Sequence, residues 1–143
     1  MPQGDIDLRQ GSILHIKDFA TRGHAKRHKF VLIIGKPTDS EVLGFLISSQ
    51  LSYLQQDSHK KEVVRIPQNA MAVFRVESII QCFTLECLSV SSLCEGFEQD
   101  RIENKGLIPV RYLHRVREAV RGSMLLTQDE IEKALRLLPQ ERP

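Results

Sequence analysis

The chain has 143 residues and a formal net charge of +2, with 41% hydrophobic and 27% charged residues. This length and composition fit one globular domain with a substantial core, and so small a net charge does not by itself indicate nucleic-acid binding. No apolar run approaches the ~20 residues that span a bilayer, and the N-terminus lacks the pattern of a signal peptide. We therefore expect a cytoplasmic protein without a membrane segment.

The first two thirds of the chain predict a mainly β domain. After a polar, flexible N-terminal lead at residues 1–10, strands are expected at 11–17, 30–34, 42–48, 62–66, 72–76 and 78–85. The second and third strands form a hairpin, because Gly35 and Pro37 interrupt the apolar pattern between them. The polar segment 51–61 predicts a short helix or a loop. Five or more short strands separated by turns indicate a small barrel or sandwich.

The last third of the chain predicts two helices. Four apolar residues recur at helical spacing, at Val110, Leu113, Val116 and Val120. They lie between a Pro suited to the first turn and a Gly suited to the end, which predicts a helix at about 109–121. A capping box beginning at Thr127 starts a second helix, at about 127–138. We expect both helices to pack on the sheet in one α+β domain, residues 11–143.

The three cysteines do not indicate a metal site. Cys82, Cys87 and Cys94 are spaced C-x4-C-x6-C, which is not the ligand spacing of zinc. His24 and His28 are four residues apart, but in a loop-like stretch rather than on a helix face. We therefore expect reduced thiols, no metal and no cofactor.

Positive charge is concentrated between residues 17 and 36. This segment holds six basic residues and two histidines against one carboxylate, Asp18: Lys17, Arg22, His24, Lys26, Arg27, His28, Lys29 and Lys36. The segment runs into strand 30–34, whereas strand 42–48 ends on the hydroxyls of Ser48 and Ser49. If the two strands are neighbours, cations and hydroxyls converge, which favours phosphate binding and RNA or nucleotide chemistry. The alternative is a solvated basic loop beside a serine that ends a strand.

Five short motifs follow one another over about residues 11–121. They are Gly11-Ser12-Ile13, His28-Lys29-Phe30-Val31-Leu32-Ile33, Ile47-Ser48-Ser49-Gln50, Phe74-Arg75-Val76-Glu77-Ser78-Ile79 and Lys105-Gly106-Leu107-Ile108. Their order resembles the MazF/PemK (Kid-like) family of toxin endoribonucleases. That family has Gly-Asp, Arg-Pro-Val-Leu-Val, Ile-Thr-x-Gln and Lys-Gly-x-Val at the places of the first, second, third and fifth motifs, and the fourth motif resembles the strand after its Asp/Glu-Gln-Ile element. The chain departs from that family at His28, which stands in the place of the catalytic Arg, and at Lys29, which replaces Pro.

The resemblance implies an SH3-like β-barrel with C-terminal helices, a homodimer, a small antitoxin protein as partner, and metal-independent cleavage of single-stranded RNA. In that reaction the ribose 2′-hydroxyl attacks the adjacent phosphorus, which requires a base, an acid and donors to the phosphorane. His28 would transfer the proton, Arg27 or Lys29 would neutralise the phosphate, and Ser48 would donate to a non-bridging oxygen. The residues that would bind the RNA are Lys26, Lys29, Ser49 and Gln50.

Two other functions are open from the sequence. One is a catalytically inactive RNA- or protein-binding module on the same barrel, favoured by the missing Arg-Pro pair. The other is a regulatory or phage-defence interaction protein that binds its partner through helix 127–138.

Overall fold

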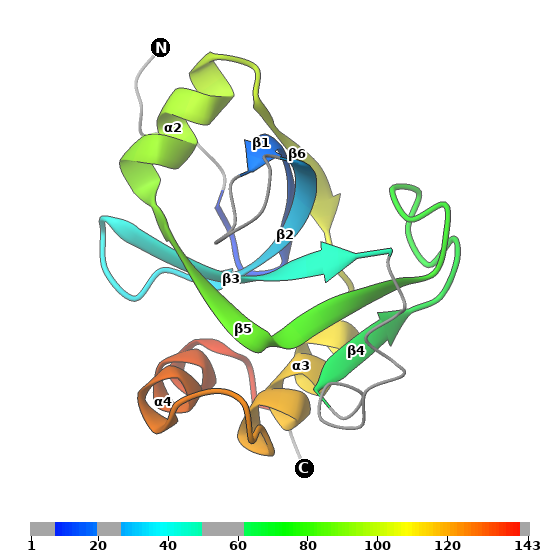
Figure 1. The fold of residues 1–143 in the computed structure, drawn as a ribbon, viewed down its shortest axis with the longest axis vertical. Coiled ribbons are helices and arrows are strands. Elements are labelled where there is room, and N and C mark those ends of the chain that lie inside the picture. The colour runs from blue at the N-terminus through cyan, green and yellow to red at the C-terminus, as the bar shows by residue number, and fades with distance from the viewer. Residues whose placement is uncertain (1–7, 20–26, 50–61, 141–143) are drawn as a thin grey trace.

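A computed structural model describes residues 8–19, 27–49 and 62–140, with the backbone only at residues 18, 19, 27 and 28. Six strands form one antiparallel sheet in the order β4-β5-β3-β2-β1-β6 (Figure 1). The strands are β1 (Ser12–Phe19), β2 (Arg27–Gly35), β3 (Glu41–Ser48), β4 (Val63–Ile66), β5 (Ser78–Ser89) and β6 (Ile102–Leu107). The described helices are α2 (Val90–Glu98), α3 (Val110–Arg121) and α4 (Gln128–Leu137).

Strands β2 and β3 form the predicted hairpin at the centre of the sheet. Their register pairs Phe30 with Ile47 and Leu32 with Phe45, and β3 and β1 flank β2 on its two sides. The four residues 31–34 of β2 are all fully buried. A strand with apolar residues on both faces requires a layer on each side. The prediction that these two strands are adjacent and central is confirmed.

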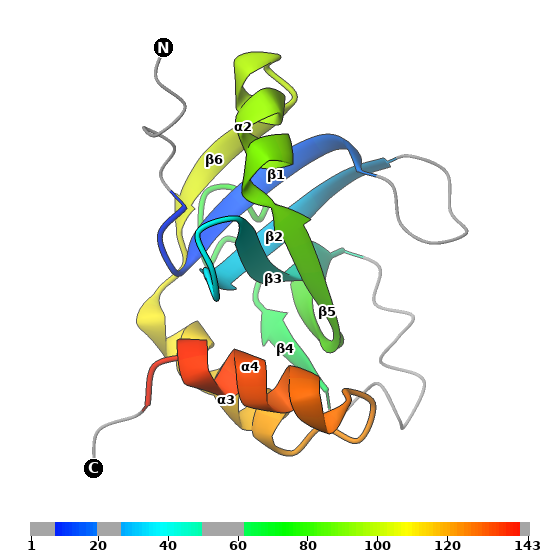
Figure 2. The same cartoon turned by 90° about the vertical axis from the view of Figure 1, so that its left-hand side faces the viewer.

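Each face of the sheet supplies one hydrophobic cluster. Leu32 and Ile34 point into the larger cluster, which α3 and α4 cover. Val31 and Ile33 point into the smaller one, which Leu93 of α2 covers. Figures 1 and 2 show α3 and α4 together on one side of the sheet and α2 on the other. Because side chains alternate between the two faces along β2, this one strand contributes residues to both hydrophobic clusters.

Strand β5 bends, so that its two halves pair with different neighbours. Its register with β3 shifts between Phe45, opposite Leu85, and Ile47, opposite Ile80. The extra residues of β5 at this shift produce the bend visible in Figure 1. Residues 78–81 at its start pair with all of β4. The bend curls the sheet, but within the described residues β4 and β6 pair only with β5 and β1, so no ladder closes the sheet into a barrel.

The structure differs from the sequence expectations in four places. Residues 72–76, predicted as a strand, form turns in which the Phe74 N–H donates to the Met71 carbonyl at 3.0 Å. Helix α2 and strand β6 were not predicted, and β5 continues to Ser89. Helices α3 and α4 lie where the apolar spacing and the capping box predict them.

A buried carboxylate fixes the start of β4. Glu62 is only 4% exposed, and it accepts hydrogen bonds from the Ser123 hydroxyl and from the Met124 backbone N–H, the latter at 3.1 Å. Burial and the nearby charge of Glu62 raise the pKa of the Cys82 thiol. The donors from the α3–α4 turn compensate the cost of burying the charge. Glu62 thus ties β4 to the helical layer.

None of the helices formed by the described residues is both long and apolar enough to cross a membrane.

Candidate nucleic-acid interface

The basic start of β2 and the hydroxyl end of β3 lie at the same end of the sheet. Phe30 pairs with Ile47, so Lys29 and Ser48 are the next residues of their strands in the same direction. Antiparallel pairing requires this, because one strand begins where its neighbour ends. The ends of β2 and β3 that carry Lys29 and Ser48 therefore lie side by side, as the sequence predicts.

The structure places only some of the predicted site residues. Lys29 and Ser48 are half-buried, and Ser49 is exposed just after β3. Arg27 and His28 belong to β2, but their side chains are outside the described part of the structure. Lys26 and Gln50 lie outside the described residues altogether.

A row of paired residues extends from this end of the sheet to its β4 edge. Ser48 of β3 pairs with Ile79 of β5, and Ile79 pairs with Arg65 of β4. Directly paired residues project from the same face, and two strand spacings separate Ser48 from Arg65 by about 10 Å. The row therefore brings a third basic residue, distant in sequence, close to the Lys29–Ser48 end.

Arg65 is partly neutralised by a neighbouring carboxylate. Its guanidinium donates to Oε1 of Glu77 through Nε at 2.7 Å and through Nη2 at 2.6 Å. The Arg65 side chain remains 60% exposed. A bridge this exposed contributes little to stability, so Arg65 can reorient towards a phosphate at small cost.

Aromatic side chains lie on the opposite face beside the same strand end. The His15 ring stacks on Phe30 with centroids 4.9 Å apart, and Phe30 meets Phe74 edge-on at 6.1 Å. His15 and Phe30 are both half-buried. Lys29 and Ser48 face the other side of the sheet, so these rings do not form one surface with them. The proximity of the His15 and Phe30 rings depends on the β1–β2 register, which pairs His15 with Phe30.

Strand β6 brings an ionised carboxylate opposite His15. Glu103 pairs with His15 across the β1–β6 ladder. Its pKa is lowered, mainly because Lys105 donates a hydrogen bond to it at 2.6 Å and secondarily through the charge of that lysine. The carboxylate therefore stays charged near neutral pH.

The described residues contain no group of three or more His, Cys, Asp or Glu side chains arranged to hold a metal ion. Arg65 was not predicted from the sequence as a residue near this site, although a basic residue between apolar ones in strand 62–66 was a visible signal.

Neither protein-family models nor curated protein sequences include a match to this chain.

Proposed function

We propose that the chain is a metal-independent endoribonuclease that cleaves single-stranded RNA, as MazF/PemK-like toxins do, at the shared end of β2 and β3. The observation that supports this most is the antiparallel pairing of these strands, in which Phe30 lies opposite Ile47. The pairing puts a strand that starts with Arg27, His28 and Lys29 beside one that ends with Ser48. Cations and a hydroxyl at one place are suited to a phosphodiester.

The reaction we propose forms a bond between the ribose O2′ and the adjacent phosphorus and breaks the bond from phosphorus to O5′. A base takes the proton of the 2′-hydroxyl, and an acid delivers a proton to the departing 5′ oxygen. His28 would move these protons, because imidazole titrates near neutral pH. Ser48 would donate to a non-bridging oxygen, and Arg27 or Lys29 would neutralise the phosphorane.

The proposal includes several properties implied by the family resemblance. The curled six-stranded sheet would be an open form of an SH3-like barrel. The protein would act in the cytoplasm as a homodimer and would be controlled by a small antitoxin protein. Lys26, Ser49 and Gln50 would contact the RNA beside the cleaved bond.

A second candidate is a catalytically inactive RNA- or protein-binding module. Two residues favour it, since His28 stands where the family has its catalytic Arg and Lys29 where it has Pro. Lys29, at the place of the family's Pro, pairs with Ile16 in the ladder between β1 and β2. Binding of RNA without cleavage would support this candidate.

The test is cleavage of a single-stranded RNA pool with a chelator present. Ser48→Ala should lower the rate about 10²–10³-fold through loss of one transition-state donor. His28→Ala should lower it about 10²–10⁴-fold through loss of proton transfer. Arg27→Ala should weaken RNA binding and flatten its salt dependence, because fewer counterions are released.

Ser92→Ala is the matched control, because Ser92 is an exposed serine on α2, away from this end of the sheet. Its activity should equal that of the wild type, and circular dichroism should show all four variants folded. Full activity of both Ser48→Ala and His28→Ala would mean that the site lies elsewhere.

A further inference from the structure

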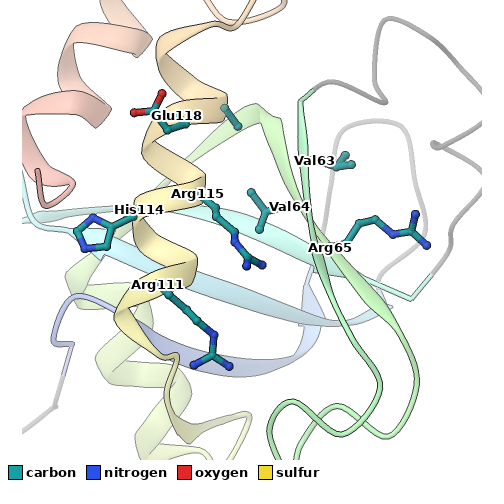
Figure 3. Close-up of a pocket in the computed structure, with 8 residues that line it drawn as sticks. Val63, Val64, Arg65, Arg111, His114, Arg115 and Glu118 are labelled. Carbon is teal, nitrogen blue, oxygen red and sulfur yellow. The ribbon is translucent and has the colours of Figure 1, made fainter. Parts of the chain in front are cut away.

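A basic groove lies between α3 and the β4 edge of the sheet. Its volume is about 770 Å³. Val63, Val64 and Arg65 line it from β4, and Arg111, Arg115 and Ala119 are among the α3 residues that line it. Figure 3 shows the guanidinium groups of Arg111 and Arg115 in the space between the helix and the strand.

An aromatic ring positions the two arginines of α3. The guanidinium carbon of Arg111 lies 4.9 Å from the centroid of the Tyr112 ring, and that of Arg115 lies 5.4 Å from it. Tyr112 is only 2% exposed, so the core holds its ring in place. Cation–π contact restrains both guanidiniums without neutralising them.

Two of the three arginines that line the groove have no ion-pair partner among the described residues. In the described parts of the chain, the ion pairs do not involve Arg111 or Arg115. Glu118 also lines the groove, but it pairs with Arg121 at 2.7 Å. Arg111 and Arg115 are one helical turn apart, about 6 Å along the axis. Two restrained guanidiniums without a carboxylate partner among the described residues are suited to bind successive anionic groups.

The groove lies on the other face of the sheet from Ser48. Val64 of β4 packs into the larger cluster with α3, so strand alternation puts the Arg65 side chain on the opposite face, and Figure 3 shows it pointing away from Arg111 and Arg115. Arg65 lines the groove and pairs with Ile79, which pairs with Ser48. Ile79 is fully buried, so a polyanion would reach both Ser48 and the groove only by passing around the β4 edge at Arg65. A single nucleic-acid strand is the polyanion that the proposed endoribonuclease function implies, and we therefore take it as the occupant of the groove.

We propose that the groove between α3 and β4 binds the phosphate backbone of single-stranded RNA on one side of the scissile bond. Arg111 and Arg115 contact the phosphates, and Arg65 lies at the β4 edge between the groove and the face that carries Ser48. The connection to Ser48 depends on the proposed endoribonuclease function, whereas phosphate binding in the groove does not. The groove increases affinity for RNA and takes no part in the chemical step.

The experiment measures binding of a fluorescent single-stranded RNA carrying 2′-O-methyl groups, which cannot be cleaved because the attacking hydroxyl is blocked. The double variant Arg111→Gln/Arg115→Gln should bind at least about tenfold more weakly at low salt. Its plot of log affinity against log salt should be shallower by about 1.4, since each phosphate contact to a single strand contributes about 0.7.

The matched control is Lys133→Gln/Arg136→Gln, which removes the same charge from two exposed residues of α4 that do not line the groove. It should bind RNA as the wild type does. Equal loss in both double variants would indicate a general charge effect and overturn the proposal. Unchanged binding by a folded Arg111→Gln/Arg115→Gln variant would overturn it as well.

Cleavage assays distinguish failure of this inference from failure of the proposed function. With cleavable RNA at saturation, Arg111→Gln/Arg115→Gln should raise KM and leave kcat unchanged, whereas Ser48→Ala should lower kcat. Binding of RNA through the groove without any cleavage would refute the nuclease function and support the groove as an RNA-binding site. Tighter binding of a polyglutamate peptide than of RNA, lost in Arg111→Gln/Arg115→Gln, would show that the groove is a protein site and overturn the inference.

Discussion

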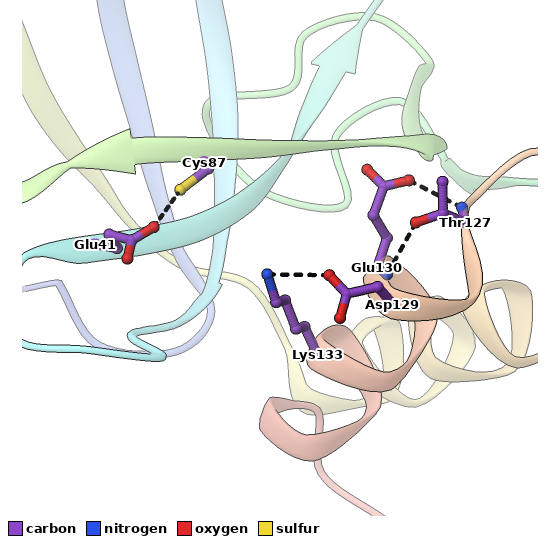
Figure 4. Close-up of polar contacts among 6 residues, drawn as sticks. All are labelled: Glu41, Cys87, Thr127, Asp129, Glu130 and Lys133. Carbon is purple, nitrogen blue, oxygen red and sulfur yellow. Dashed lines mark hydrogen bonds and ion pairs between the residues drawn. The ribbon is translucent and has the colours of Figure 1, made fainter.

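At the scale of single residues, the exposed thiol of Cys87 shows how a neighbour controls reactivity. Its Sγ donates a hydrogen bond to Oε2 of Glu41 at 3.0 Å (Figure 4). This hydrogen bond is the main cause of a raised Cys87 pKa, and desolvation and the negative charge of Glu41 act in the same direction. The charge of Lys133 acts in the opposite direction. Since the thiolate is the nucleophile, Cys87 should react slowly despite its exposure.

The first prediction concerns the pH dependence of Cys87 alkylation. A raised pKa means less thiolate at any given pH. The alkylation rate should therefore reach half of its maximum at a higher pH than for a free thiol. Glu41→Gln should move that midpoint down, and Lys133→Gln should move it up. Mass spectrometry after iodoacetamide treatment would give the rate at Cys87, with buried Cys82 as an unreactive internal reference. The same midpoint in all three proteins would contradict the role of Glu41.

Gly44 is the residue at which the β2–β3 pair cannot accept a side chain. A Cβ there would lie 2.6 Å from the Leu32 carbonyl oxygen and 2.9 Å from Cγ1 of Val31. The carbonyl belongs to the central strand of the sheet and cannot move without disturbing its ladder. Close approach of the two backbones therefore requires glycine at this position.

The second prediction is that Gly44→Ala lowers the free energy of unfolding by about 1–3 kcal/mol through overpacking. Gly122→Ala is the control, because its nearest contact would be the Glu118 carbonyl oxygen at an ordinary 3.7 Å. That control should change stability by less than about 1 kcal/mol. Urea denaturation of both variants measures the difference. Equal midpoints would show that the sheet adjusts at Gly44.

At the scale of elements, α4 is fixed at both ends. At its start the Thr127 hydroxyl accepts from the Glu130 N–H at 3.1 Å, and the Glu130 carboxylate accepts from the Thr127 N–H at 2.9 Å (Figure 4). At its end Arg117 of α3 donates to the carbonyls of Leu135 at 2.8 Å and Leu138 at 3.2 Å. These bonds satisfy groups that helix ends leave without intrahelical partners.

The N-terminal segment also contributes to holding α4. Gln10 donates through Nε2 to the Ile34 carbonyl at 2.7 Å and to the Leu137 carbonyl. One amide therefore joins the end of β2 to the last turn of α4. Residues 8–10, which close the expected flexible lead, take part in this packing, and Leu8 contacts the smaller hydrophobic cluster.

The third prediction is that Thr127→Ala lowers the free energy of unfolding by about 0.5–2 kcal/mol, because the Glu130 N–H loses its acceptor. Amide hydrogen exchange should become faster in α4 before it changes in the central strands. Gln128→Ala, at an exposed position in the first turn, is the control and should leave both measurements unchanged. Wild-type exchange rates in α4 of the Thr127→Ala variant would show that the contacts of Arg117 and Gln10 at its C-terminal end are sufficient to hold the helix.

At the scale of the whole molecule, the two edges of the sheet differ. Strand β6 is an edge strand whose last five residues are all exposed, with Glu103 and Lys105 among them. Charged side chains on an edge discourage pairing with another chain. The β4 edge instead faces the groove beside α3. Its half-buried residue is the apolar Val63, and its exposed residue is the basic Arg65.

The fourth prediction is a C2 homodimer, which the family resemblance implies. A stable pair should bury about 1,200–2,000 Å² in a self-complementary contact. Light scattering at tens of micromolar should give twice the mass of one chain, and dilution should dissociate the pair. A single-chain mass throughout that range would refute the dimer and weaken the nuclease proposal with it.

The elements predicted correctly from the sequence are those with strong local patterns. Residues 30–34 form an unbroken apolar run, and Thr127 begins a capping box, so neighbouring residues alone specify β2 and α4. The elements that were missed lack such patterns. Strand β6 has only one buried residue, Ile102, and is a strand because β1 pairs with it. The apolar segment at 72–76 has a strand-like sequence, but Phe74 enters the core from a turn.

The same distinction applies to the candidate sites. The sequence by itself determined that the basic start of β2 and Ser48 meet, because a short hairpin forces one strand to begin where the other ends. Only the tertiary structure brought Arg65 into line with Ser48 through Ile79 of β5, and Arg111 and Arg115 into a groove beside β4. These contacts join segments far apart in the chain. Their geometry depends on strand order, on the bend of β5 and on the packing of α3, none of which a local pattern specifies.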